Sequence, residues 1–225
     1  MHILENKFDI PIALSFSILA GIICFLGIML AAFNRTIAER FSHIGAILAG
    51  FLLGLIAITH LLPESLSFGI LASLFICLGF LLGLYLDKVG HVDTQHIGHV
   101  TLTPIIAIAL HSFLDGMIYV VSFGHSHEGG IFAGIGLVLH ELPEGLITFI
   151  LCFSLLKRLI PALTLAIFAA ALSTPMGTII GNILGHHWGE AFLAYAYPIS
   201  AGLVSWASIS LLKEHAVKIL PNRNR

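Results

Sequence analysis

The chain has 225 residues, of which 58% are hydrophobic and 10% are charged, and its mean hydropathy is +1.02. Soluble domains are about one quarter charged, so this composition argues strongly against a water-soluble protein. The formal net charge is −2 and no tract is strongly basic, which argues against nucleic acid as a partner.

A transmembrane helix needs about 20 apolar residues, so a chain of this length has room for about seven or eight spans and for no separate soluble domain. We expect an all-α, polytopic transmembrane helix bundle that forms a single domain over residues 1–225. The three cysteines lie far apart in apolar stretches without CxxC spacing, and we interpret them as core residues.

Apolar runs bounded by charged residues, prolines or histidine clusters predict seven helices. In chain order they cover about residues 11–33, 43–63, 68–86, 102–123, 130–153, 159–182 and 190–212. The first run follows Glu5, Lys7 and Asp9, which is not the positive start of a secretory signal, so we expect a retained span.

The basic residues predict the orientation, because lysine and arginine near the ends of spans are retained on the cytoplasmic side. All but Lys7 fall in the loops after spans one, three and five or in the tail: Arg35, Arg40, Lys88, Lys157, Arg158, Lys213, Lys218, Arg223 and Arg225. We therefore expect the N-terminus outside, the C-terminus inside and a multi-pass location in the cell (plasma or inner) membrane.

Several of the 13 histidines gather in the predicted loops after spans three, four and six: His91, His96, His99, His125, His127, His186 and His187. Each one alone reads as an ordinary polar loop residue. Together they favour weak metal capture on both faces of the membrane.

The predicted fourth and fifth helices each contain a histidine and a carboxylate four residues apart. The fourth contains HSFLDG, with His111 and Asp115, and the fifth contains HELPEG, with His140 and Glu144. This spacing stacks the two side chains on one helical face, where the pair can grip one ion.

The two pairs are expected to lie at the same depth. His111 and His140 are each about ten residues into their helices from opposite sides, which is roughly 15 Å from the surface and near the midplane. A loop of about six residues joins the helices, so they must be antiparallel neighbours. A set of two imidazoles and two carboxylates suits zinc, iron(II), manganese or cobalt, and the lack of thiolate argues against copper(I).

The cost of burying charge supports a functional interpretation. Burying an ionised carboxylate at the bilayer centre without a cation or a wet cavity costs several kcal/mol. This applies to three acids here, Asp115, Glu141 and Glu144. A purely structural alternative pairs the acids with protonated histidines to lock the two helices together. Such a lock needs only one pair and does not call for Pro143 and the glycines beside it, which make room for an ion.

A third pair, His60 and Glu64, lies at the end of the predicted second helix in the sequence HLLPES. Two interpretations stay open, a solvated helix end and a vestibule site that receives the ion.

These motifs resemble those of the ZIP (Zrt/Irt-like protein) family of metal transporters. The resemblance covers helices two to seven: HLLPES, the His-containing loop after helix three, HSFLDG, HELPEG and STPMGTIIG in helix six. The paired motifs of helices four and five are the specific part, because the bacterial GufA-like branch typically carries HNxPEG in one or both central helices.

The resemblance implies that His111, Asp115, His140 and Glu144 are ligands of a first metal site, with the two acids in bridging positions. It also implies that Glu141 is a ligand of a second site.

Two departures from the family pattern weaken that second site. Ser112 stands where the family usually has asparagine, and Thr174 stands before Pro175 where many members have glutamate. We therefore expect one strong site, with Ser112 and Thr174 as residues of a degraded second site or of the pathway.

The family normally has eight spans, one more than predicted here. In the family, helices one, four, five and six carry the ion and move against a wall of helices two, three, seven and eight. Losing the eighth would thin the wall without removing the ligands. Transport would then call for a partner subunit, and a homodimer is left open.

The expected function is uptake of divalent transition metals toward the cytoplasm, with Zn²⁺ first and iron or manganese as further substrates, and without enzymatic activity. An intramembrane zinc metallohydrolase is an alternative, because His140 and Glu141 match the start of HExxH, but Glu144 replaces the second histidine. A metal-binding subunit that does not transport is a third possibility.

Overall fold

The structure is a computed structural model that describes residues 6–33, 42–89, 102–125 and 127–219. The described part of the chain is helical, with no strand, as expected of an all-α bundle. Six of its helical segments are long and apolar enough to cross a membrane: Ile12–Phe33, Ile47–Ser67, Thr103–Gly124, Gly130–Leu156, Leu159–Leu184 and Ala191–Lys213. The prediction of an all-α polytopic bundle is confirmed.

The helices follow the predicted order. Helix α1 spans Asn6–Phe33, and α3 (Ser42–Ile56) continues through a π-helical turn, η1 (Ala57–Leu61), into α4 (Leu62–Ser67). Then come α5 (Ala72–Val89), α6 (Thr103–His125) and α7 (His127–Leu156). The chain ends with α8 (Leu159–Ala166), a second π-helical turn η2 (Ile167–Ala171) and α9 (Ser173–Ile219).

The predicted third span, residues 68–86, corresponds to α5, which is a helix but is not one of the six segments above. The count of seven spans therefore stays a prediction.

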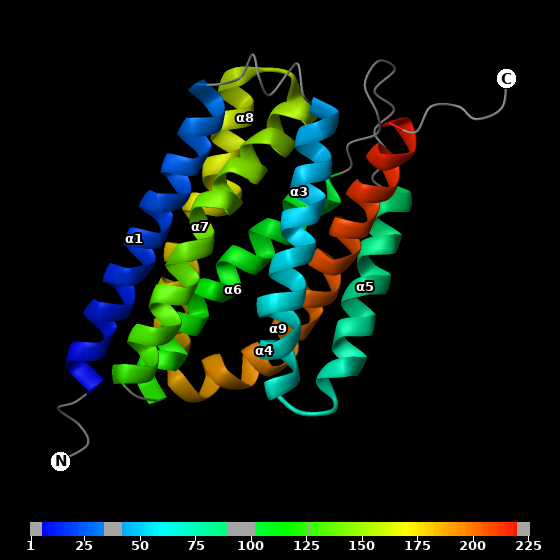
Figure 1. Ribbon diagram of the computed structural model, residues 1–225. Helices are drawn as coiled ribbons and strands as arrows, with labels where there is room; N and C mark the ends of the chain where they lie inside the picture. The colour runs from blue at the N-terminus through cyan, green and yellow to red at the C-terminus, as the bar shows by residue number, and fades with distance from the viewer. Residues whose placement is uncertain (1–5, 34–41, 90–101, 126, 220–225) are drawn as a thin grey trace, which may run out of the picture.

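Two predicted loops are wrong. The loop of about six residues after the fourth span is much shorter, since α6 ends at His125 and α7 begins at His127. The histidines of this tract lie within the helices, and the start of α7 packs closely on α6, since a Cβ at Gly130 would collide with the Phe123 ring. The loop at 183–189 is helical, because α9 continues through it and changes direction at the bottom of Figure 1. Glycine in a helix costs only about 1 kcal/mol, so this tract can stay helical.

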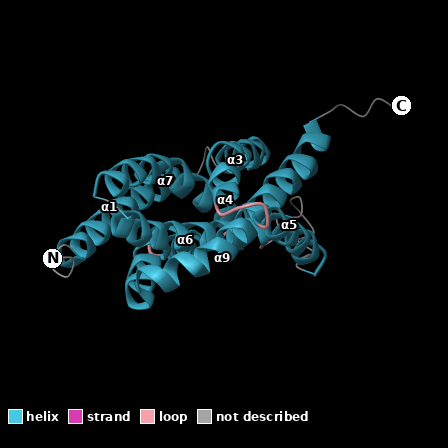
Figure 2. Cartoon of the chain, turned by 90° about the horizontal axis from the view of Figure 1, so that it is seen from below, coloured by secondary structure: helices cyan, strands magenta, loops and turns pink. Residues whose placement is uncertain are grey.

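The helices form two bundles, which Figures 1 and 2 show side by side. We call α1, α6, α7, α8, η2 and residues 173–184 of α9 the first bundle. The second bundle consists of α3, η1, α4, α5 and residues 191–219 of α9. In the first bundle α6 and α7 are the most enclosed helices, because 61% of the apolar stretch of each is buried inside the structure. For the span formed by α3, η1 and α4 in the second bundle, the buried share is 28%.

Glycines bring the backbones of the first bundle into contact. A Cβ at Gly116 of α6 would collide with the backbone of α9, and one at Gly177 of α9 would collide with the backbone of α6. Gly27 of α1 and Gly145 of α7 make the same kind of contact with each other's helix. Small residues allow helices to approach this closely within a membrane.

The second bundle is built in the same way. Gly79 of α5 and Gly202 of α9 each lie against the backbone of the other helix, and Gly83 lies against the Trp206 ring. Gly50 of α3 packs on the backbone and side chains of α9 around Ser208. Every close glycine contact found among the described residues joins helices of the same bundle, so each bundle is tightly tied within itself.

The ends of α5, α7 and α9 lie at one end of the molecule, together with the start of α8 (Figure 1). Whereas Lys7 lies at the start of α1, these ends carry Lys88, Lys157, Arg158, Lys213 and Lys218. The fold therefore gathers them on one side, as the predicted orientation requires, while the side of the membrane itself stays a prediction.

Candidate metal centre

The site is built on α6 and α7, the two most enclosed helices. His111 and His140 lie at nearly equal distances from the short turn that joins the helices, so the two predicted pairs come to the same depth. His111, Asp115 and Glu144 are at most 1% exposed, and the His140 side chain is 16% exposed. The prediction that these four side chains face one another is confirmed.

The donor atoms of the four side chains are close together. His140 Nε2 lies 3.0 Å from Asp115 Oδ2 and 3.9 Å from Glu144 Oε2. His111 places Nδ1 3.4 Å from Asp115 Oδ1 and Nε2 3.6 Å from Glu144 Oε2. Zinc bonds of about 2.0–2.1 Å in a tetrahedron put neighbouring donors about 3.3 Å apart. The observed separations are close to that spacing.

Several of these buried atoms have no hydrogen-bond partner among the described residues. They are both ring nitrogens of His111, Asp115 Oδ1 and Glu144 Oε2. Buried polar atoms normally find partners, and leaving a carboxylate oxygen unpaired is costly. A cation among these atoms would satisfy several of them at once.

His60 joins the site from the second bundle. It lies in the π-helical turn η1, a distortion that often occurs at functional sites. Its ring centre is 5.4 Å from that of His140 and 6.3 Å from that of His111. The interpretation of His60 as a merely solvated helix end is therefore wrong, because its ring faces the buried histidines.

Two overlapping groups of three donors could hold a metal ion. One consists of His111, His140 and Glu144, and the other of His60, Asp115 and His140; within each group the donor atoms lie within 4.8 Å of one another. His140 belongs to both. An ion could therefore shift between the two groups without losing all of its ligands.

Ser112 supports the site without belonging to either group. Its hydroxyl points its single hydrogen toward two acceptors, Glu144 Oε1 and the Ile108 carbonyl at 2.8 Å, which share it. The bond leaves Glu144 Oε2 free and fixes the direction of the carboxylate. Hydrogen bonds of this kind orient metal ligands in proteins.

Glu141 lies one turn before Glu144 on α7 and is absent from both donor groups. Its Oε1 accepts a hydrogen bond from Thr174 Oγ1 at 3.2 Å, and the Cys24 thiol of α1 lies beside it. Its Oε2 has no partner among the described residues. The structure thus brings Glu141 and Thr174 together, as the resemblance implies, but next to Cys24.

Glu64 is half-buried one turn beyond His60 and is absent from both donor groups. Among the loop histidines, His91, His96 and His99 lie outside the described residues. The side chains of His125, His186 and His187 are also outside what the structure describes. His127 packs edge-on against Phe123.

Tyr197 is a site residue that sequence reasoning missed. It is fully buried on α9, and its hydroxyl lies 3.1 Å from His60 Nε2. A tyrosine two residues from another tyrosine and next to a proline carries no signal of its own. Only the packing of α9 against η1 brings it to the histidines.

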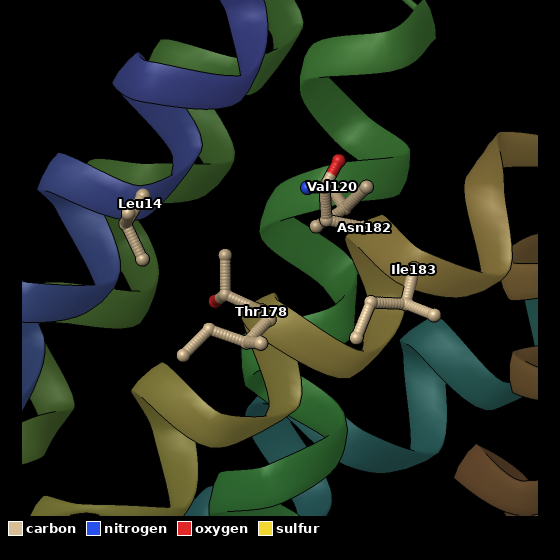
Figure 3. Close-up of a pocket in the computed structure, with 6 residues that line it drawn as sticks. Leu14, Val120, Thr178, Asn182 and Ile183 are labelled. Atoms are coloured by element: carbon tan, nitrogen blue, oxygen red, sulfur yellow. The ribbon is translucent and has the colours of Figure 1, made fainter.

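A cavity of about 90 Å³ lies elsewhere, between α1, α6 and α9 (Figure 3). Its lining is mostly aliphatic, with Thr178 and Asn182 as the polar side chains. None of the candidate ligands lines it. The metal group and this cavity are therefore separate features.

Comparison with models of known protein families and with curated protein sequences gave no match. What the fold and the site define is a helical, membrane-type bundle whose buried histidines and carboxylates could bind a metal ion.

Proposed function

We propose that this protein is a carrier of divalent transition-metal ions, zinc first among them, of the ZIP family and its GufA-like branch. It takes the ion from outside into the cytoplasm across the plasma or inner membrane. The observation that carries the proposal is the group of imidazole and carboxylate donors from α6 and α7, buried at mid-span with unpaired donor atoms.

The two bundles support transport over simple binding. The first bundle supplies His111, Asp115, His140 and Glu144, while the second supplies His60. An ion held between two tightly tied bodies can be exposed to one side and then to the other if the bodies move past each other. Such movement requires each bundle to stay rigid internally. The close glycine contacts within each bundle meet this requirement.

We do not propose a hydrolase. In HExxH enzymes the second histidine is a zinc ligand and the glutamate polarises the water. Here Glu144 stands at the position of the second histidine, and Glu141 bonds Thr174 and belongs to neither donor group. The acid that would activate water is instead bonded to a threonine hydroxyl.

Uptake into proteoliposomes tests the proposal. Purified protein should carry zinc into vesicles, with iron(II), manganese and cadmium measured in parallel for selectivity. The double variant Asp115→Ala, Glu144→Ala removes one acid from each donor group and should abolish uptake. Uptake by the double variant equal to that of the unmodified protein would sink the proposal.

A further inference from the structure

Tyr197 connects the two bundles at the metal group. Its ring meets the His60 ring edge-on, at 84° and 6.4 Å between centres, and its hydroxyl lies 3.1 Å from His60 Nε2. The same hydroxyl lies near the Asp115 carboxyl on α6. One buried hydroxyl of the second bundle thus bonds His60 of its own bundle and lies close to a candidate ligand of the other.

This contact competes with metal binding at His60. A ring nitrogen either carries a hydrogen or offers one lone pair. While Nε2 of His60 is bonded to Tyr197, whichever of the two supplies the hydrogen, that nitrogen cannot also bind an ion. The Tyr197 hydroxyl lies near both His60 Nε2 and Asp115, so this nitrogen is the one on the side of the donor group.

We propose that Tyr197 is a latch, a positioning residue that holds His60 and Asp115 in the metal-free protein and lets go of them when a divalent ion binds. In the metal-free state the latch ties the second bundle to α6. Ion binding displaces the Tyr197 hydroxyl, and coordination of the ion by His60 and Asp115 replaces the hydrogen-bonded contact. The inference rests on the proposed function, since it assigns Tyr197 the control of that same site.

Tyr197→Phe removes the hydroxyl and keeps the ring, so every proposed ligand remains. Metal no longer has to displace the hydroxyl, and zinc should bind about threefold to tenfold more tightly, the range that the net free energy of one hydrogen bond gives. A residue that merely supported the fold or the bound ligand would show the opposite change. The matched control is Tyr195→Phe, two residues away on the same helix, where the tyrosine is 57% exposed and packs on Phe75.

Two measurements on the detergent-purified full chain test the latch. Zinc titration gives the dissociation constants of the unmodified protein, Tyr197→Phe and Tyr195→Phe. Infrared difference spectra between zinc-loaded and metal-free protein report the hydroxyl: a tyrosine C–O band should appear in the unmodified protein and in Tyr195→Phe and should vanish in Tyr197→Phe.

An unchanged or weaker zinc affinity in folded Tyr197→Phe would overturn the latch while leaving the proposed function standing. So would the lack of any tyrosine band in the unmodified protein, a result that needs no variant to fold. Failure of the unmodified protein to bind zinc at all would remove the proposed function and the latch together.

Discussion

At the residue scale, the site depends on acids and imidazoles whose buried donor atoms have each other as neighbours but lack full hydrogen bonding. Glu144 shows this most clearly, because Ser112 satisfies one of its oxygens and the other faces His111 and His140. An oxygen held in that way is prepared for a cation and is costly without one.

Glu144→Gln keeps the shape of this side chain and removes its charge. We expect zinc affinity to fall by about tenfold or more, since even indirect supports of metal sites cost that much when changed. Isothermal titration of the purified protein measures the effect. The control is Glu128→Gln, in the first turn of α7, where the acid is exposed and outside both donor groups. Equal affinities of the two variants would show that Glu144 is not a ligand.

His60→Ala removes one of the three donors of the second group while leaving His111, His140 and Glu144 in place. Zinc should still bind, but about tenfold more weakly, and uptake at limiting zinc should slow. Thr59→Ala is the control in the same π-helical turn, because that exposed hydroxyl bonds only the Leu55 carbonyl one turn back. If His60→Ala behaved like Thr59→Ala, the second donor group would have no role.

The four candidate ligands on α6 and α7 could be predicted from sequence because a spacing of four residues fixes a helical face without any knowledge of packing. His60 could be named but not placed, since its approach depends on the extra residue in η1. Tyr197 could not be found at all, because it reaches the site only through contact between α9 and η1.

At the scale of the elements, the predicted helices lie close to the observed ones, because long apolar runs in this composition leave few other structures available. The errors fall in two tracts where histidines interrupt an apolar run, residues 124–129 and 183–189. Helices α6 and α7 extend into the first tract, and α9 runs through the second. A polar tract that stays helical cannot be told from one that ends a helix before the packing around it is known.

Glycine packing between α6 and α9 gives a stability prediction. In Gly177→Val the added side chain meets the Phe113 backbone, and we expect a loss of about 1–3 kcal/mol in the free energy of unfolding. Gly136→Ala is the control: no atom lies within 4 Å of its added Cβ, and the helical position should gain about 0.5–1 kcal/mol. Unfolding titrations in mixed detergent compare the two. Equal stability of the two variants would contradict the described contact.

The second bundle has its own buried polar contact, far along α5 and α9 from the metal group. Asp87 accepts hydrogen bonds from Trp206 Nε1 at 2.8 Å and from Ser210 Oγ at 2.6 Å. Asp87→Ala leaves two donors unpaired and should cost about 1–3 kcal/mol for each of them in unfolding free energy. Zinc affinity should not change, whereas the neighbouring exposed Lys88→Ala should alter neither quantity. A loss of zinc binding in folded Asp87→Ala would contradict the separation of the two sites.

At the scale of the whole molecule, close glycine contacts tie each bundle within itself, and the donor groups lie where the bundles meet. Hydropathy alone predicts the spans but not this division, because the division depends on which helices share close contacts. The sequence resemblance implies a moving part and a wall, and movement of one bundle against the other stays a prediction.

The central claim is that imidazole and carboxylate donors from α6, α7 and η1 hold one divalent ion. X-ray absorption spectroscopy of the zinc-loaded protein tests it most directly. We expect one zinc ion per chain with only nitrogen and oxygen neighbours at about 2.0–2.1 Å, two of them imidazoles. A sulfur neighbour at about 2.3 Å, or a shell of oxygens without imidazole, would contradict the claim.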